Sequence, residues 1–259
     1  MRIPRLYVDL PLREGITVRL EGSEAHYPKN VLRCRTGTRL TLFNGEGGEF
    51  SALVGAMDRQ GLDIAIESFV NTDRESPVNI HLGLGITKRD AMDTAIRKAT
   101  ELGVSAVTPV ITAYTDLPKK ALAGRPDHWQ QILRSACEQC ERNRLPALSA
   151  PVSLTSWLSS LEADTRLVAH PGGTGNLDEL LSRAGNVAIL TGPEGGFSDE
   201  EIIECEAARF RCVGLGPRIL RADTATVVML SLVQARLGDL NAGRERYVAS
   251  RTPASCDSM

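Results

Sequence analysis

The segment 187–198 reads VAILTGPEGGFS, and the segment 212–221 reads CVGLGPRILR. In each, a short apolar run ends in a glycine-bearing loop, and an expected helix follows the loop. Open α/β sheets bind ligands in loops of this kind, at the carboxyl ends of their strands, and glycine lets main-chain atoms approach a ligand closely. One such loop alone is more often an ordinary turn. Two in one stretch predict a small-molecule pocket built largely from backbone.

Acidic residues crowd the helix that follows the first loop. Ser198 and Glu201 have the spacing of a capping box, and Asp199 and Glu200 lie in the same turn. Phosphate-binding loops leave the helix N-terminus open to an anion, so these carboxylates, with Glu194 nearby, would repel a polyphosphate. The sequence also lacks the glycine–lysine signature of nucleotide hydrolases, the dinucleotide-binding glycine fingerprint and the serine-hydrolase elbow. The pattern favours a nucleoside-like or cationic ligand.

The second loop places two arginines before a very apolar helix. Asp223 or Thr224 is expected to cap this helix, which continues to about Leu237. A helix that is apolar on most sides is deeply buried or lies in a subunit interface. Arg218 and Arg221 are equally compatible with structural ion pairs and with binding a phosphate of a large substrate.

Three further residues invite a chemical interpretation. His170 ends the expected strand 166–169, where a catalytic role is conceivable, but a histidine before proline is more often a turn residue. Cys137 and Cys140 have a metal-binding or redox spacing, yet both fall on the apolar stripe of the expected helix 126–142. Because no second pair or histidine cluster supplies more ligands, we expect core packing and no metal.

The composition is that of a globular protein without a strong electrostatic field. The 259 residues are 42% hydrophobic and 24% charged, with a formal net charge of −2. RNA binding would therefore need a local basic patch. Neither a signal peptide nor an apolar stretch of membrane-spanning length is visible, so we expect a cytoplasmic protein that does not contact a membrane.

The chain divides at a polar segment that ends in Pro77. Residues 1–74 are rich in short strands, expected at 38–43, 49–57 and 62–66, with a short helix near 23–32, and they predict a small barrel. Residues 75–243 alternate strands with helices, which predicts a parallel sheet. The expected strands are 78–86, 104–111, 166–169, 187–191 and 211–215, and the expected helices are 90–102, 126–142, 153–161, 177–184, 199–209 and 223–238. Residues 244–259 are expected to form a flexible tail.

The two loops together strongly resemble the ribosomal RNA small subunit methyltransferase E family, a branch of the SPOUT methyltransferases. The likeness is carried by Ile189–Ser198 with Leu215–Arg221, and it extends to the start of the chain, the Phe43–Gly45 turn, Lys98–Val104 and Glu138–Arg144. It thus covers residues 1 to about 240. The chain has Ala-Asp-Thr at 222–224 where the family usually has Thr-Glu-Thr, so the contacts of Asp223 are expected to shift.

The resemblance implies an α/β fold with a trefoil-knotted parallel sheet that carries helices on both faces, preceded by a PUA-like β-barrel. It implies S-adenosylmethionine as the methyl donor and N3 of one uridine of 16S rRNA, near the decoding centre of the small ribosomal subunit, as the acceptor. It also implies a homodimer. The implied cofactor-binding residues come from both loops: Leu190, Thr191, Gly192, Pro193, Glu194, Gly195, Gly196, Leu215, Gly216, Arg218, Ile219, Leu220 and Thr224.

The residues that handle the RNA are less sharply indicated. A protonated uracil N3 needs a base or a stabilising cation, and Arg142 and Asn143, at the end of an amphipathic helix, are candidates for orienting the uridine. The alternative is a surface ion pair of Glu138 with Arg142. Candidate RNA-binding residues are Arg2, Arg5, Arg33, Arg144 and Arg221. Two other functions stay open: a methyltransferase of the same fold acting on another RNA, and a non-catalytic RNA-binding assembly factor.

Overall fold

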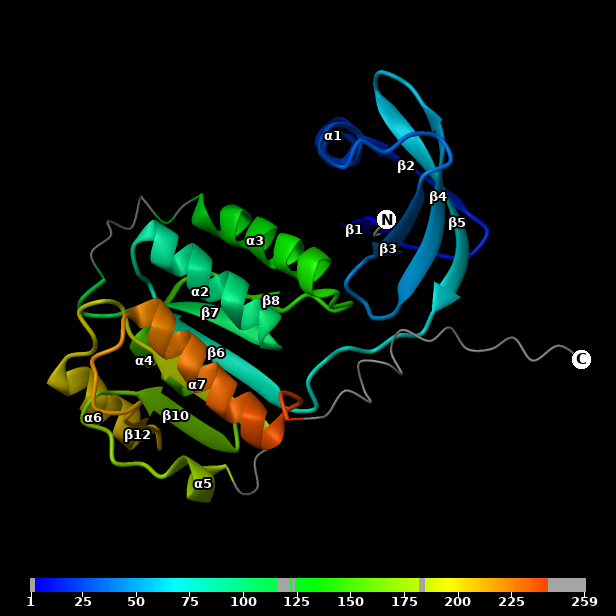
Figure 1. The fold of residues 1–259 in the computed structure, drawn as a ribbon. Helices are drawn as coiled ribbons and strands as arrows, with labels where there is room; N and C mark the ends of the chain where they lie inside the picture. The colour runs from blue at the N-terminus through cyan, green and yellow to red at the C-terminus, as the bar shows by residue number, and fades with distance from the viewer. Residues whose placement is uncertain (1–2, 116–121, 123, 182–184, 242–259) are drawn as a thin grey trace, which may run out of the picture. The chain divides into compact units, whose positions relative to one another are not determined.

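The computed structural model describes residues 3–115, 122, 124–181 and 185–241, which form two compact units (Figure 1). The first unit runs to Glu75 and also includes Cys137–Leu145, and the second runs from Ser76 to Ala136 and resumes at Pro146. The sequence placed the boundary near residue 75, but it gave no sign that the segment 137–145 belongs with the first unit. The predicted tail from residue 244 lies outside the described residues.

The first unit is built on a five-stranded sheet in the order β1-β3-β4-β5-β2. Alternating apolar residues such as Leu40, Leu42, Leu62 and Ile64 face its core and are almost completely buried. The strands are β1 (Arg5–Tyr7), β2 (Thr17–Glu21), β3 (Arg39–Phe43), β4 (Glu49–Met57) and β5 (Gly61–Val70). The predicted strands at 38–43, 49–57 and 62–66 are therefore confirmed. The expected short helix is divided into α1 (Gly22–His26) and the π-helix η1 (Tyr27–Val31), which has Pro28 in its first turn.

The second unit is built on a seven-stranded sheet in which every pairing is parallel. The order is β12-β10-β11-β6-β7-β8, and β9 also pairs with β7. The strands are β6 (Asn79–Gly85), β7 (Ala106–Ile111), β8 (Ala147–Leu148), β9 (Val152–Ser153), β10 (Thr165–Ala169), β11 (Asn186–Thr191) and β12 (Arg211–Val213). The parallel sheet is confirmed; the two-residue strands β8 and β9 were not predicted, because so short a run shows no periodicity.

Helices cover both faces of this sheet, as the layers in Figure 1 show. They are α2 (Arg89–Glu101), α3 (Arg125–Cys140), α4 (Leu154–Ser160), α5 (Leu177–Leu180), α6 (Asp199–Ala207) and α7 (Ala222–Leu237). Successive residues of one strand point to opposite faces: Ile189 packs in the cluster that contains residues of α2, α3 and α7, whereas Leu190 packs with Trp157 of α4 and Phe210. No described helix is long and apolar enough to cross a membrane.

The predicted cap of the last helix is wrong, and the predicted capping box after the first loop is confirmed. Helix α7 begins at Ala222 without a side-chain cap, and the Asp223 carboxylate instead accepts a hydrogen bond from the Thr224 amide at 2.8 Å. Helix α2 begins at Arg89, one residue before the expected start at residue 90. The Ser198–Glu201 capping box is present at the start of α6. The starts of α7 and α2 differ from the expected ones by one or two residues, which is the ordinary spread for helix ends.

Candidate functional site

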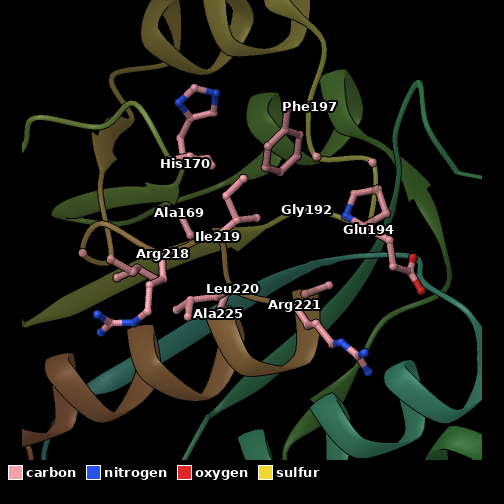
Figure 2. A pocket seen from close by; sticks show the side chains of 17 residues that line it. Ala169, His170, Gly192, Glu194, Phe197, Arg218, Ile219, Leu220, Arg221 and Ala225 are labelled. Atoms are coloured by element: carbon pink, nitrogen blue, oxygen red, sulfur yellow. The ribbon is translucent and has the colours of Figure 1, made fainter.

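A cavity of about 470 Å³ lies at the carboxyl ends of β10, β11 and β12 (Figure 2). These three strands are neighbours in the parallel sheet, so the loops that leave them meet at one edge. The volume is in the range of small-molecule sites. The lining comes from all three loops and the start of α7: Ala169, His170, Pro171, Gly192, Pro193, Glu194, Gly195, Gly196, Phe197, Leu215, Gly216, Arg218, Ile219, Leu220, Arg221, Ala222 and Ala225.

The loop after β11 is held by its own hydrogen bonds and by the capping box. Gly196 has a φ of +74°, and its amide donates to the Pro193 carbonyl at 2.9 Å. One oxygen of Glu201 accepts from the Ser198 amide at 3.0 Å, and the other accepts from the Ala113 amide at 2.7 Å. The Glu201 carboxylate is therefore committed to structure, whereas that of Glu194 is exposed and accepts from the Lys88 amide at 3.3 Å.

The loop after β12 presents an apolar side chain and two cations. The side chain of Ile219 is 88% exposed and, in Figure 2, stands in the cavity across from Phe197. Gly216 has a φ of +93°, and no atom lies within 4 Å of the position that a Cβ would occupy. The guanidinium groups of Arg218 and Arg221 are exposed, and no carboxylate in the described part of the chain pairs with them.

A buried pair of threonines ties the floor of the cavity together. The hydroxyls of Thr191, at the end of β11, and Thr226, in the first turns of α7, lie 2.9 Å apart. Thr226 also donates to the Ala222 carbonyl at 2.9 Å. Because both side chains are fully buried, this contact fixes where one loop begins relative to where the other ends.

His170 forms a turn and at the same time lines the cavity. Its carbonyl accepts from the Gly173 amide at 2.9 Å, and its Nδ1 accepts from the Gly172 amide at 3.2 Å. The turn interpretation is thus confirmed. Because Nδ1 acts as an acceptor, the neutral ring carries its proton on Nε2.

Most of the predicted cofactor-binding residues line this cavity, and three do not. Leu190 and Thr191 are fully buried beneath the loop, and Thr224 is exposed outside the lining set. The sequence prediction missed Ala169, His170, Pro171, Phe197, Ala222 and Ala225, and it assigned Arg221 to RNA alone. The expected strand 166–169 was the available signal, because its carboxyl end had to meet the same sheet edge.

The lining suits a nucleoside-sized ligand without phosphates. Phe197, Ile219 and Leu220 supply apolar surface for a planar base, and the glycine-rich loops expose main-chain donors and acceptors. The open space at Gly196 and Gly216 lies where any other residue would place a side chain. Glu194 offers a carboxylate to a cationic group at the loop that follows β11, whereas Arg218 and Arg221 place positive charge at the loop that follows β12.

The two predicted catalytic residues do not line the cavity and have partners inside the first unit. Arg142 is 4% exposed, and its Nε lies 3.0 Å from a carboxylate oxygen of Glu75. Burial alone would lower the pKa of the Arg142 guanidinium, but Glu75 outweighs burial and raises that pKa above its ordinary value. Asn143 is 1% exposed and donates to the Thr72 carbonyl at 2.8 Å.

Arg5 completes this cluster and is as enclosed as its neighbours. Its guanidinium pairs with Glu49 at 2.5 Å and lies 4.5 Å from the centre of the Phe43 ring. It also donates to the Asn143 side chain, and Arg74 pairs with the same Glu49 at 3.0 Å. We name Arg5, Glu49, Arg74, Glu75, Arg142 and Asn143 the buried ion cluster. Its contacts are structural, and the uridine-orienting role predicted for Arg142 and Asn143 stays a prediction.

The other predicted RNA-binding arginines differ in their exposure. Arg33 and Arg144 are exposed, Arg221 lies at the cavity, and Arg2 lies outside the described residues. Of the two cysteines assigned to the core, Cys137 is fully buried, and burial raises the pKa of its thiol to about 12. Cys140 is half-buried.

Comparisons with known proteins match both units. A family model described as an RNA methyltransferase domain matches residues 74–234, and one described as an RNA methyltransferase PUA domain matches residues 20–67. The chain is 35% identical over 243 residues to the ribosomal RNA small subunit methyltransferase E of Buchnera aphidicola subsp. Schizaphis graminum, covering 93% of this chain and 99% of the relative. It is 32% identical to the protein of that name from Synechocystis, covering 85% of this chain and 74% of the relative.

Two solved structures are similar along almost the whole chain. A Legionella pneumophila methyltransferase, in complex with the bound cofactor SAM, has a TM-score of 0.88 and 36% identity, covering 93% of this chain and 100% of that one. The ribosomal RNA small subunit methyltransferase E of Neisseria gonorrhoeae, bound to S-adenosyl methionine, has a TM-score of 0.86 and 33% identity, covering 92% and 100%.

Proposed function

Because the chain belongs to the ribosomal RNA small subunit methyltransferase E family, we propose that it transfers the methyl group of S-adenosylmethionine to N3 of one uridine of 16S rRNA. The observation that carries the proposal is the cavity at the ends of β10, β11 and β12, with apolar walls, open glycine positions and the carboxylate of Glu194 at its lining. The substrate would be met in the cytoplasm, as part of the small ribosomal subunit.

The donor fits the cavity by its chemistry. Ile219 and Leu220 would pack against the adenine, and main-chain groups of the loops at 192–196 and 215–220 would bind the polar parts. The bound donor supplies an electrophilic methyl group on a sulfonium. The loops contribute by fixing where that methyl points, which is a positioning effect. The target base must leave its stack before its N3 can reach the cavity.

The acceptor nitrogen must lose its proton, and the cavity offers groups that would stabilise the charge. Arg218 and Arg221 present exposed guanidinium groups at the lining, and His170 would present the Nε2–H donor of its neutral ring. A cation or a hydrogen-bond donor near a uracil oxygen lowers the cost of forming the imidate anion. The cavity itself thus offers three candidates for stabilising the imidate: Arg218, Arg221 and His170.

We also expect the protein to act as a homodimer through α7. The buried side of this helix carries Met229, Leu230 and Val233, yet Leu232 is 39% exposed, although the helix is apolar on most sides. An exposed apolar side chain on such a helix is consistent with a covered interface. Sedimentation equilibrium tests this: a dimer is expected for the intact chain, and a monomer at all concentrations would exclude it.

The test of the proposed function uses unmethylated small ribosomal subunits from a strain that lacks the gene. Incubation with the purified protein and isotopically labelled S-adenosylmethionine should yield labelled 3-methyluridine in 16S rRNA, identified by nucleoside mass spectrometry. A different labelled nucleoside would support a related enzyme with another target. Failure to bind S-adenosylmethionine in a calorimeter would favour a non-catalytic assembly factor.

A further inference from the structure

A second cavity, of about 280 Å³, lies away from the lining of the first one. Among the residues that the structure describes, those that line it are Arg89, Gly124, Arg125 and His128. Three of these four residues have a side chain that carries or can carry a positive charge, and the fourth is a glycine. The proposed methyl transfer does not use any of them. A cavity with this lining has the chemistry of an anion site.

The first turns of two long helices supply the cationic side chains. Arg89 is the first residue of α2, and Arg125 is the first residue of α3. His128 lies in the first turn of α3, like Arg125. The imidazole of His128 contacts Asp93 of α2, with 2.7 Å between Nε2 and Oδ2. This contact joins the two helices at the cavity. The partial positive charges of the helix N-termini add to the field of the side chains.

The charge at the cavity is only partly neutralised. Arg89 is exposed, and within the described part of the chain no carboxylate pairs with it. Asp93 is engaged with His128. Asp90 and Asp127 lie in the first turns of the same helices, but neither lines the cavity. The Arg89 guanidinium therefore provides positive charge that an entering ligand would meet.

The cavity is linked to the methyl-donor site through one residue. Lys88 immediately precedes Arg89, and its amide donates to the carboxylate of Glu194, which lines the first cavity, at 3.3 Å. In Figure 2 the Arg221 side chain extends from the rim of that cavity toward the side on which α2 lies. A polyanion whose reacting base entered the first cavity would thus carry its backbone past this face.

We propose that Arg89 and Arg125, with His128, form a phosphate-binding site that takes a backbone phosphodiester of the RNA near the methylated nucleotide. The inference rests on the proposed function, since it is that function which makes RNA the source of the phosphate. Contacts to phosphate fix the register of a nucleic acid without reading its sequence. The site would hold the RNA while the target base is displaced.

The test measures how salt affects binding of unmethylated small ribosomal subunits. The double variant R89Q/R125Q should weaken binding roughly tenfold, and the slope of log affinity against log salt should fall by about 0.7–0.9 for each arginine removed. The matched control is R97Q/R211Q, because Arg97 and Arg211 are exposed and line neither cavity. That control should keep the wild-type slope. The variant R89K/R125K keeps both positive charges, so it should retain most of the salt slope.

Two further measurements separate the outcomes. Calorimetry with S-adenosylmethionine and thermal unfolding should give wild-type values for R89Q/R125Q, which shows that the variant is folded and that the donor site is intact. Titration with inorganic phosphate at constant ionic strength distinguishes a free-phosphate site from an RNA site. The RNA assignment is overturned if R89Q/R125Q loses phosphate binding but keeps the wild-type salt slope for subunit binding. An unchanged slope without phosphate binding overturns the site altogether. If wild-type protein binds neither donor nor subunits, the proposed function itself fails.

Discussion

Two groups of arginines in this chain lie in opposite surroundings. Arg5, Arg74 and Arg142 belong to the buried ion cluster, where each is paired with Glu49 or Glu75. Arg218 and Arg221 are exposed at the donor cavity, and no carboxylate in the described chain pairs with them. Members of both groups, such as Arg142 and Arg218, come from segments that resemble the family's motifs. The comparison teaches that the motif identifies the family, whereas burial and partners decide which arginines are available to a substrate.

The difference has an energetic basis. A buried charge without its partner is costly, so removing a partner from the first group is expected to destabilise the fold. An exposed guanidinium costs little to leave unpaired, because water solvates it. The second group is therefore free to acquire a partner when RNA or another anion arrives. The predictions below change one group or the other, so that the two roles can be separated.

The largest effect is expected when the donor cavity is filled. Gly216 has a positive φ and open space at its Cβ position, so G216V would place a strained, branched side chain where the donor is expected. We expect S-adenosylmethionine binding to fall below detection in calorimetry. The matched control is G37V, because Gly37 has a φ of +84° and equally open space in the first unit. Equal loss of donor binding in both variants would point to unfolding rather than to blocking of the cavity.

The second effect is on stability and concerns the buried ion cluster. R142M removes a 4% exposed cation and leaves the carboxylate of Glu75 without it. Breaking a buried pair typically costs about 3–5 kcal/mol, so the free energy of unfolding in urea should fall by about that amount. The matched change at the cavity, R218M, should leave the free energy of unfolding unchanged. A stable R142M protein that has lost only methyl transfer would instead favour the catalytic role predicted for Arg142.

A smaller effect is expected at the wall of the donor cavity. The Ile219 side chain is 88% exposed, so I219S should change stability by less than about 0.5 kcal/mol. The same change removes the apolar surface expected against the adenine, and donor affinity should fall on the order of tenfold. I203S provides the control, because Ile203 is 65% exposed on α6 and does not line the cavity. If I219S binds the donor like the control, Ile219 does not contact it.

The smallest effect is a change in the acid dependence of stability. Burial alone would raise the pKa of Glu49, but Arg74 and Arg5 outweigh burial and hold that pKa below its ordinary value. Between the two values the unfolded chain binds more protons than the folded one, so the contribution of Glu49 is present at neutral pH and is lost as the pH falls through the folded pKa. Urea unfolding of E49Q should therefore show a shallower loss of stability below about pH 4.3 than wild-type protein. A parallel acid limb would contradict this.

Local pattern was sufficient to predict much of the fold and part of the site. The alternation of strands and helices from residue 78, the Ser198–Glu201 capping box and the two glycine-bearing loops are all features of nearby residues. The residues of the two loops also carry the resemblance to the family. The cavity-lining role of Gly192–Gly196 and Leu215–Leu220 follows from the same stretch.

The remaining features depend on contacts between distant residues, which periodicity does not encode. Arg142 pairs with Glu75, 67 positions away, and Asn143 bonds to Thr72. The local i, i+4 spacing pointed only to Glu138, whose carboxylate accepts from the distant Tyr7 amide at 2.9 Å. His170 joined the cavity because β10 lies between β11 and β12, a strand order that the sequence alone does not give.

The most direct measurement is a crystal structure of this protein grown with S-adenosylmethionine. The account predicts that the adenosine and methionine parts occupy the cavity at the ends of β10, β11 and β12, with the base against Ile219 and Leu220 and the methyl group open to an incoming nucleotide. Donor density at any other place, or side chains closing this cavity, would contradict it.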